Sequence, residues 1–67
     1  MIEITLNGES VHVEKPLSLV ELLMKHGIDP TKVAVERNLE IVPKSQYAIT
    51  MIDAGDRLEV VHFIGGG

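Results

Sequence analysis

The stretch IEITLNGESVHV (residues 2–13) predicts a β-hairpin and sets the fold class. Apolar residues fill every second position on both sides of one Asn-Gly pair: Ile2, Ile4, Leu6, Val11 and Val13. Alternation with a period of two is typical of strands buried on one face. Asn7-Gly8 favours a two-residue type I′ turn, because both central residues of that turn have positive φ.

Beyond Pro16 the apolar period changes from strand to helix. The residues at helical spacing are Leu19, Val20, Leu22 and Leu23. Ser18 followed by Glu21 fits a capping box, in which each side chain accepts a hydrogen bond from the other residue's backbone amide. Gly27 suits the position just past a helix C-terminus. We therefore expect one helix over about residues 19–26.

The second half of the chain predicts three further strands. The first covers residues 33–36, and the short apolar pair Ile41-Val42 follows a turn at Asn38-Leu39. Residues 44–50 look irregular, with room for a single helical turn. Asp53-Ala54-Gly55-Asp56 marks a tight turn, and the last strand starts near Leu58.

The order β-β-α-β-β-β predicts one α+β domain over residues 1–67. One amphipathic helix across one face of a mixed sheet of four to five strands is the simplest way to bury this pattern. A β-grasp fold fits, with the first and last strands as neighbours. Residues 64–67 would then leave the sheet centre as a free, flexible tail.

Composition excludes several classes of protein. The net charge of −4 and the lack of a basic patch argue against nucleic-acid binding. The chain has no cysteine, so disulfides and zinc–thiolate sites are excluded. The acidic start MIEITLNGE does not resemble a signal peptide, and no apolar run is long enough to span a bilayer. We expect a soluble, cytoplasmic protein without a membrane partner.

Catalytic patterns are weak throughout the chain. His12, His26 and His62 are scattered and have no second ligand at a metal-site spacing. Asp53 and Asp56 flank a turn, where short acids bond their own backbone. We therefore expect no enzyme, no catalytic residue, no metal site and no bound cofactor.

The glycines Gly65, Gly66 and Gly67 are the main functional candidate. Without Cβ atoms they can enter a channel too narrow for other residues. A terminal carboxylate on Gly67 is ionised at neutral pH and can attack the α-phosphorus of ATP to form an acyl-adenylate. A persulfide could convert that adenylate to a thiocarboxylate. The alternative is an unstructured terminus without function.

The last strand predicts a docking patch beside this tail. If Leu58 and Val60 face the helix, Val61 and Phe63 lie on the opposite face. With Ile64 they would form an exposed patch for the enzyme that receives the tail. Alternatively, Phe63 folds back over one end of the sheet.

The sequence resembles the ThiS-type sulfur carriers of thiamine biosynthesis, which are small ubiquitin-like proteins ending in Gly-Gly. The similarity rests on VAVERN (33–38), EIVPKSQYA (40–48) and AGDRLEVVHFIGGG (54–67). It implies a ubiquitin-like β-grasp fold and adenylation of Gly67 by a ThiF-like, E1-type adenylyltransferase that uses ATP. A sulfur donor such as a cysteine desulfurase would supply sulfur for a Gly67 thiocarboxylate, and thiazole synthase would use it for the thiazole ring.

Two residues depart from the family pattern. Leu39 stands where glycine is common, and a leucine at positive φ is strained by about 1 kcal/mol or more. Asn38 alone could take the left-handed conformation, or the turn could be built differently. Lys44 stands where arginine is frequent, and we expect a solvated charge there.

Three other functions remain open at this point. The small subunit of molybdopterin synthase uses the same thiocarboxylate chemistry but is usually somewhat longer. A ubiquitin-like modifier would be conjugated to lysines, and a plain interaction domain would have an inert tail.

Overall fold

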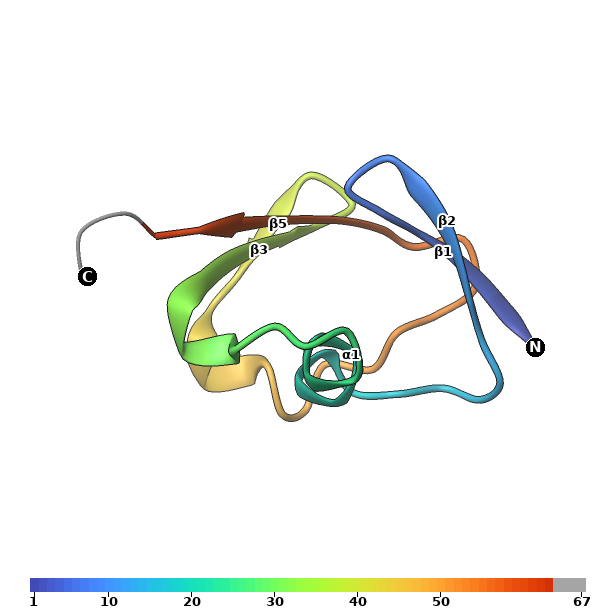
Figure 1. Cartoon of the computed structure of the whole chain (residues 1–67), viewed down its shortest axis with the longest axis horizontal. Helices are drawn as coiled ribbons and strands as arrows, with labels where there is room; N and C mark the ends of the chain where they lie inside the picture. Colours follow the sequence, from blue (N-terminus) through green and yellow to red (C-terminus); the bar gives the residue numbers. More distant parts are fainter. Residues whose placement is uncertain (64–67) are drawn as a thin grey trace.

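The computed structural model describes residues 1–63, which form a five-stranded sheet with one α-helix. The elements in chain order are β1 (Ile2–Leu6), β2 (Glu9–Val13), α1 (Leu19–Lys25), the 3₁₀ turn η1 (Pro30–Lys32), β3 (Val33–Arg37), β4 (Glu40–Val42), the 3₁₀ turn η2 (Lys44–Gln46) and β5 (Arg57–His62). Figure 1 shows α1 and both 3₁₀ turns on the same side of the sheet. The predicted tail, residues 64–67, lies outside the described residues.

The sheet is mixed, with the strand order β2-β1-β5-β3-β4. The first and last strands are parallel neighbours in its centre, and the other pairings are antiparallel. The prediction of a β-grasp with one helix on one face is therefore confirmed.

The N-terminal hairpin has the predicted turn. Asn7 and Gly8 have φ values of 49° and 83°, as a type I′ turn requires. The Asn7 side chain also binds both backbone groups of Val60, accepting from its N–H at 2.7 Å and donating to its C=O at 3.3 Å. The turn therefore joins the hairpin to the last strand.

Helix α1 begins at the predicted cap and ends one residue earlier than expected. Ser18 Oγ accepts from the Glu21 amide at 3.1 Å, and Glu21 Oε1 accepts from the Ser18 amide at 2.9 Å. His26 is the C-terminal cap residue, and Gly27 follows with a φ of 72°.

The core lies between α1 and the sheet and is almost entirely aliphatic. Its fully buried members are Ile4, Val13, Leu19, Leu22, Leu23, Val33, Val35, Ile52 and Leu58. Tyr47 is buried beside them, and its hydroxyl donates to the Val33 carbonyl at 3.1 Å. Burial raises the pKa of Tyr47. The buried aliphatic side chains therefore hold the helix against the sheet.

The second hairpin contains a strained residue. Asn38 and Leu39 both have positive φ, at 52° and 71°. Of the two alternatives left open by the sequence, the one in which Asn38 alone takes the left-handed conformation is therefore excluded, and Leu39 shares that conformation with it. Strand β3 also runs one residue further than predicted, to Arg37, which pairs with Glu40 across this turn.

Within residues 1–63, no helix has the length and apolar character needed to cross a membrane.

Candidate functional site

The last strand carries the chain from the sheet centre toward the end of the molecule opposite the N-terminus (Figure 1). It leads to Phe63, the last described residue. The predicted site residues Ile64, Gly65, Gly66 and Gly67 lie outside the described residues. The structure therefore describes the surface from which the predicted tail begins.

The two faces of β5 are assigned correctly by the alternation of its residues. Leu58 and Val60 are buried toward α1. Val61 is 64% exposed on the opposite face, and Phe63 is 46% exposed just past the strand. Both side chains are accessible to a partner, as the docking hypothesis requires.

Two contacts hold Phe63 in place at the end of the sheet. Its amide donates to the Lys32 carbonyl at 2.9 Å, which extends the β3–β5 pairing by one position. The Lys44 Nζ lies 4.4 Å from the centroid of its ring, within the range of a cation–π interaction. Phe63 is therefore fixed by its neighbours while half of its surface remains open.

Lys44 is more than the solvated charge we expected. Its Nζ also donates to the Thr31 carbonyl at 2.6 Å, so one ammonium group connects η1, η2 and the end of β5. Sequence reasoning missed this role because Lys44 and Phe63 are far apart in the chain, and no local pattern links them.

A mostly apolar pocket of about 260 Å³ adjoins Lys44 on the helix side. It is lined by Val20, Pro30, Thr31, Lys44, Tyr47 and Ala48. Lys44 thus lines this pocket and also contacts Phe63 just past the end of β5.

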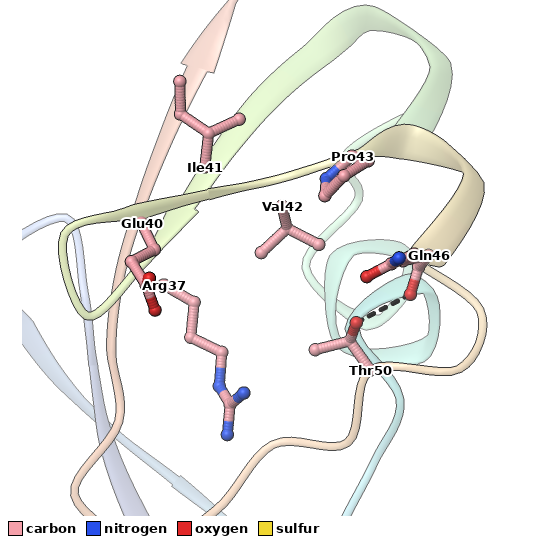
Figure 2. A pocket seen from close by; sticks show the side chains of 7 residues that line it. All are labelled: Arg37, Glu40, Ile41, Val42, Pro43, Gln46 and Thr50. Atoms are coloured by element: carbon pink, nitrogen blue, oxygen red, sulfur yellow. Dashed lines mark hydrogen bonds between the residues drawn. The ribbon is translucent and has the colours of Figure 1, made fainter.

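A second pocket of about 200 Å³ is formed by residues of β4, η2 and the segment that follows η2, together with Arg37. Its lining is drawn in Figure 2 and comprises Arg37, Glu40, Ile41, Val42, Pro43, Gln46 and Thr50. Two of these residues are joined by a hydrogen bond, in which the Thr50 hydroxyl donates to the Gln46 carbonyl at 2.7 Å (Figure 2). Figure 2 also shows Ile41 pointing to the opposite side of β4 from Val42.

The turn acids Asp53 and Asp56 are structural. Asp56 is 5% exposed and accepts hydrogen bonds from Arg37 Nε at 2.9 Å, Asn38 Nδ2 at 3.1 Å and the Asp53 amide at 2.8 Å. Burial raises the pKa of Asp56, but these hydrogen bonds and the Arg37 charge outweigh burial and leave the pKa below its usual value. An ionised carboxylate that accepts three hydrogen bonds stabilises the turn. These contacts do not support a catalytic role for Asp53 and Asp56.

The three histidines are not brought together. His12 lies 3.7 Å from Glu3 on the N-terminal hairpin, His26 caps α1, and His62 pairs with Val33 in the sheet. Among residues 1–63 no group of three or more His, Cys, Asp or Glu side chains could hold a metal ion.

Comparison with known proteins assigns the chain to a family. The model of the ThiS family matches residues 3–67, which include the C-terminal glycines. The chain belongs to the ThiS family. A curated member of comparable length, the sulfur carrier protein ThiS of Bacillus subtilis, is 38% identical over 63 residues, covering 92% of this chain and 96% of its own.

Longer relatives contain a similar segment. A thiazole synthase of Paramagnetospirillum magneticum is 50% identical over 66 residues, or 98% of this chain. The ThiS-family chain spans only 20% of that protein's length.

Solved structures agree with the family assignment. The crystal structure of a thiamine biosynthesis protein, ThiS, from Geobacter metallireducens matches with a TM-score of 0.85 at 30% identity. The match covers 98% of this chain and 100% of that one. The ubiquitin-like β-grasp is therefore confirmed for residues 1–63, the part of the chain that the structure describes.

Proposed function

We propose that this protein is the sulfur carrier of thiamine biosynthesis and that the α-carboxylate of Gly67 is its working group. The observation that carries the proposal is the ThiS family match, which extends through Gly66 and Gly67. The name of the Bacillus subtilis relative supports the same role. The protein then acts as a substrate and sulfur donor for other enzymes and has no catalytic activity of its own.

The proposed chemistry has three steps. The Gly67 carboxylate attacks the α-phosphorus of ATP on a ThiF-like adenylyltransferase, and pyrophosphate leaves. A persulfide, formed on a protein such as a cysteine desulfurase, then attacks the acyl-adenylate carbonyl and displaces AMP. A thiol reduces the resulting acyl disulfide, leaving a thiocarboxylate on Gly67. ATP is used in the partner's site, so the carrier binds no cofactor, and we place these steps in the cytoplasm.

The surface around the end of β5 fits a partner that must enclose the tail. Val61 and Phe63 are exposed there, and Lys44 and the Lys32 carbonyl hold Phe63. We propose that Val61, Phe63 and Ile64 contact the enzyme that acts on Gly65–Gly67. Thiazole synthase is the proposed recipient of sulfur, since the matching segment occurs within proteins of that name.

The test is reconstitution of the first step with purified adenylyltransferase. The enzyme should exchange labelled pyrophosphate into ATP only when the full-length carrier is present. A variant without Gly67 should abolish exchange while unfolding at the same denaturant concentration as the parent. Exchange that continues without Gly67 would refute adenylation at this residue.

Formation of product separates thiamine synthesis from the molybdopterin alternative. The thiocarboxylate should support formation of the thiazole by thiazole synthase. Sulfur delivered to a pterin precursor instead would reject the thiamine role.

A further inference from the structure

The face of the sheet opposite α1 carries two glutamates side by side. In the pairing of β3 with β5, Glu36 lies directly opposite Glu59. Both side chains project from the face that Val61 shares, because residues two apart in a strand point the same way. Glu59 is exposed and Glu36 is half-buried. We refer to these two residues as the carboxylate pair.

The register places the carboxylate pair at close range. The Asn38 amide donates to the Arg57 carbonyl at 2.8 Å across the same two strands. Hydrogen-bonded pairs recur at every second position of an antiparallel ladder, so Glu36 and Glu59 form the next such pair. Their Cα atoms are therefore about 5.5 Å apart. Like charges directly opposite one another destabilise a sheet.

The described residues do not neutralise this repulsion. Within residues 1–63, neither glutamate has a lysine, arginine or histidine nitrogen within 4.0 Å. Arg57 occupies the diagonal position on the same face, without an ion pair to either glutamate. Arg37 belongs to the helix side, where it binds Asp56 at 2.9 Å.

Apolar side chains surround the carboxylate pair. Ile41, 76% exposed, lies opposite Glu36 on β4. Ala34 and Val61 face one another two positions along β3 and β5. Glutamates without a counter-ion, framed by exposed apolar groups, are complementary to an apolar surface that presents a cation. Arginine suits this position best, since its planar guanidinium can bind two carboxylates at once.

We propose that this face docks thiazole synthase through an arginine or lysine that inserts between Glu36 and Glu59, with apolar side chains against Ile41 and Val61. The inference rests on the proposed function. Thiazole synthase is the favoured occupant because two proteins of that name contain a segment similar to this chain within their own sequence. The face also continues along β5 to Val61, three residues before the start of the tail at residue 64.

This arrangement predicts opposite effects on stability and on binding. Replacing one glutamate of the pair by glutamine removes the repulsion, so the free protein becomes more stable. The same change removes half of the charge that attracts the partner's cation, so binding weakens. A purely structural role for these residues would lower stability and binding together.

The experiment is calorimetric titration of the full-length carrier into thiazole synthase from the same organism, at low and moderate salt. The variants are Glu36→Gln and Glu59→Gln. The matched control is Glu14→Gln, which changes the net charge equally at an exposed position beyond β2. We expect affinity to fall about tenfold for each variant of the pair, with a weaker dependence on salt. The control should bind within about twofold of the parent.

Three results would overturn the docking proposal. In the first, Glu59→Gln binds thiazole synthase as tightly as the parent does. In the second, the control Glu14→Gln weakens this binding as much as the variants of the carboxylate pair. In the third, the variants of the pair weaken binding to the adenylyltransferase but not to thiazole synthase. The proposed function is judged separately, by thiocarboxylate formation on the parent. A parent that forms the thiocarboxylate but does not bind thiazole synthase refutes the docking inference alone.

Discussion

Replacement of Asp56 by asparagine tests whether one buried carboxylate holds the turn before β5. Its Oδ2 accepts from Arg37 Nε and from the Asp53 amide, and its Oδ1 accepts from Asn38 Nδ2. Asparagine has one acceptor oxygen and one donor amide in the same shape. In the variant, at least one of the three groups that donate to Asp56 therefore meets the new side-chain NH₂ group instead of an acceptor oxygen.

The cost follows from these contacts. A buried donor without a partner costs about 1–3 kcal/mol, and loss of the negative charge weakens the bond to Arg37 further. We expect the free energy of unfolding to fall by about 2–3 kcal/mol. A domain of this size has a total of roughly 3–10 kcal/mol, so the melting temperature should fall by about 10–20 °C.

The assay is urea unfolding together with a melting curve, and Asp53→Asn is the control. The Asp53 side chain is 77% exposed and lies 3.4 Å from Arg37, so its removal should change stability by less than about 1 kcal/mol. Equal stability of the Asp56 and Asp53 variants would refute the account of this turn.

The lowered pKa of Asp56 adds a dependence on pH. Because the folded state favours the ionised form, this carboxylate contributes its stability above the pKa of the unfolded chain. That contribution is lost as the pH falls through the folded pKa. Asp56→Asn should therefore lose much less stability than the parent between neutral pH and about pH 3. Parallel losses in the two proteins would contradict this sign.

The remaining predictions concern three single positions. Lys44→Met removes the ammonium group that contacts Thr31 and Phe63, so the Phe63 amide should exchange its hydrogen faster. The control Lys25→Met should leave this exchange rate unchanged. Equal exchange rates in the two variants would count against the Lys44 contact. Leu39→Gly should raise the free energy of unfolding by about 0.5–1 kcal/mol, because relief of about 1–2 kcal/mol of strain exceeds the entropy gained by the unfolded chain. A lower urea midpoint would show that Leu39 is not strained. Ser18→Ala removes the helix cap and should cost about 1 kcal/mol, measured as a lower urea midpoint; an unchanged midpoint would mean that the capping box contributes little.

The parts of the fold that depend on local chemistry could be predicted from the sequence. Asn7-Gly8 specifies its turn because positive φ is needed there, and Ser18 with Glu21 specifies the helix start through mutual hydrogen bonds. The alternation of Leu58 and Val60 was enough to assign the two faces of the last strand.

Contacts between distant segments could not be predicted. The Asn7 side chain binds Val60 across 53 positions, and Lys44 reaches Phe63 only after both 3₁₀ turns have formed. The position of Glu36 opposite Glu59 likewise depends on strand register, which no local pattern fixes. The sequence marks Leu39 as unusual for its turn, but the conformation of this residue depends on the hairpin as a whole.

Intact-mass analysis of the protein recovered from its own cells, before and after alkylation, tests the Gly67 thiocarboxylate most directly. The chain has no cysteine, so at neutral pH a thiol-directed reagent should add once, at the thiocarboxylate. Alkylation also distinguishes sulfur at Gly67 from oxidation of the three methionines, which changes the mass by nearly the same amount. We predict one adduct, located at Gly67 by fragmentation and absent from cells without the adenylyltransferase. An unmodified Gly67 carboxylate in cells that are making thiamine would contradict the account.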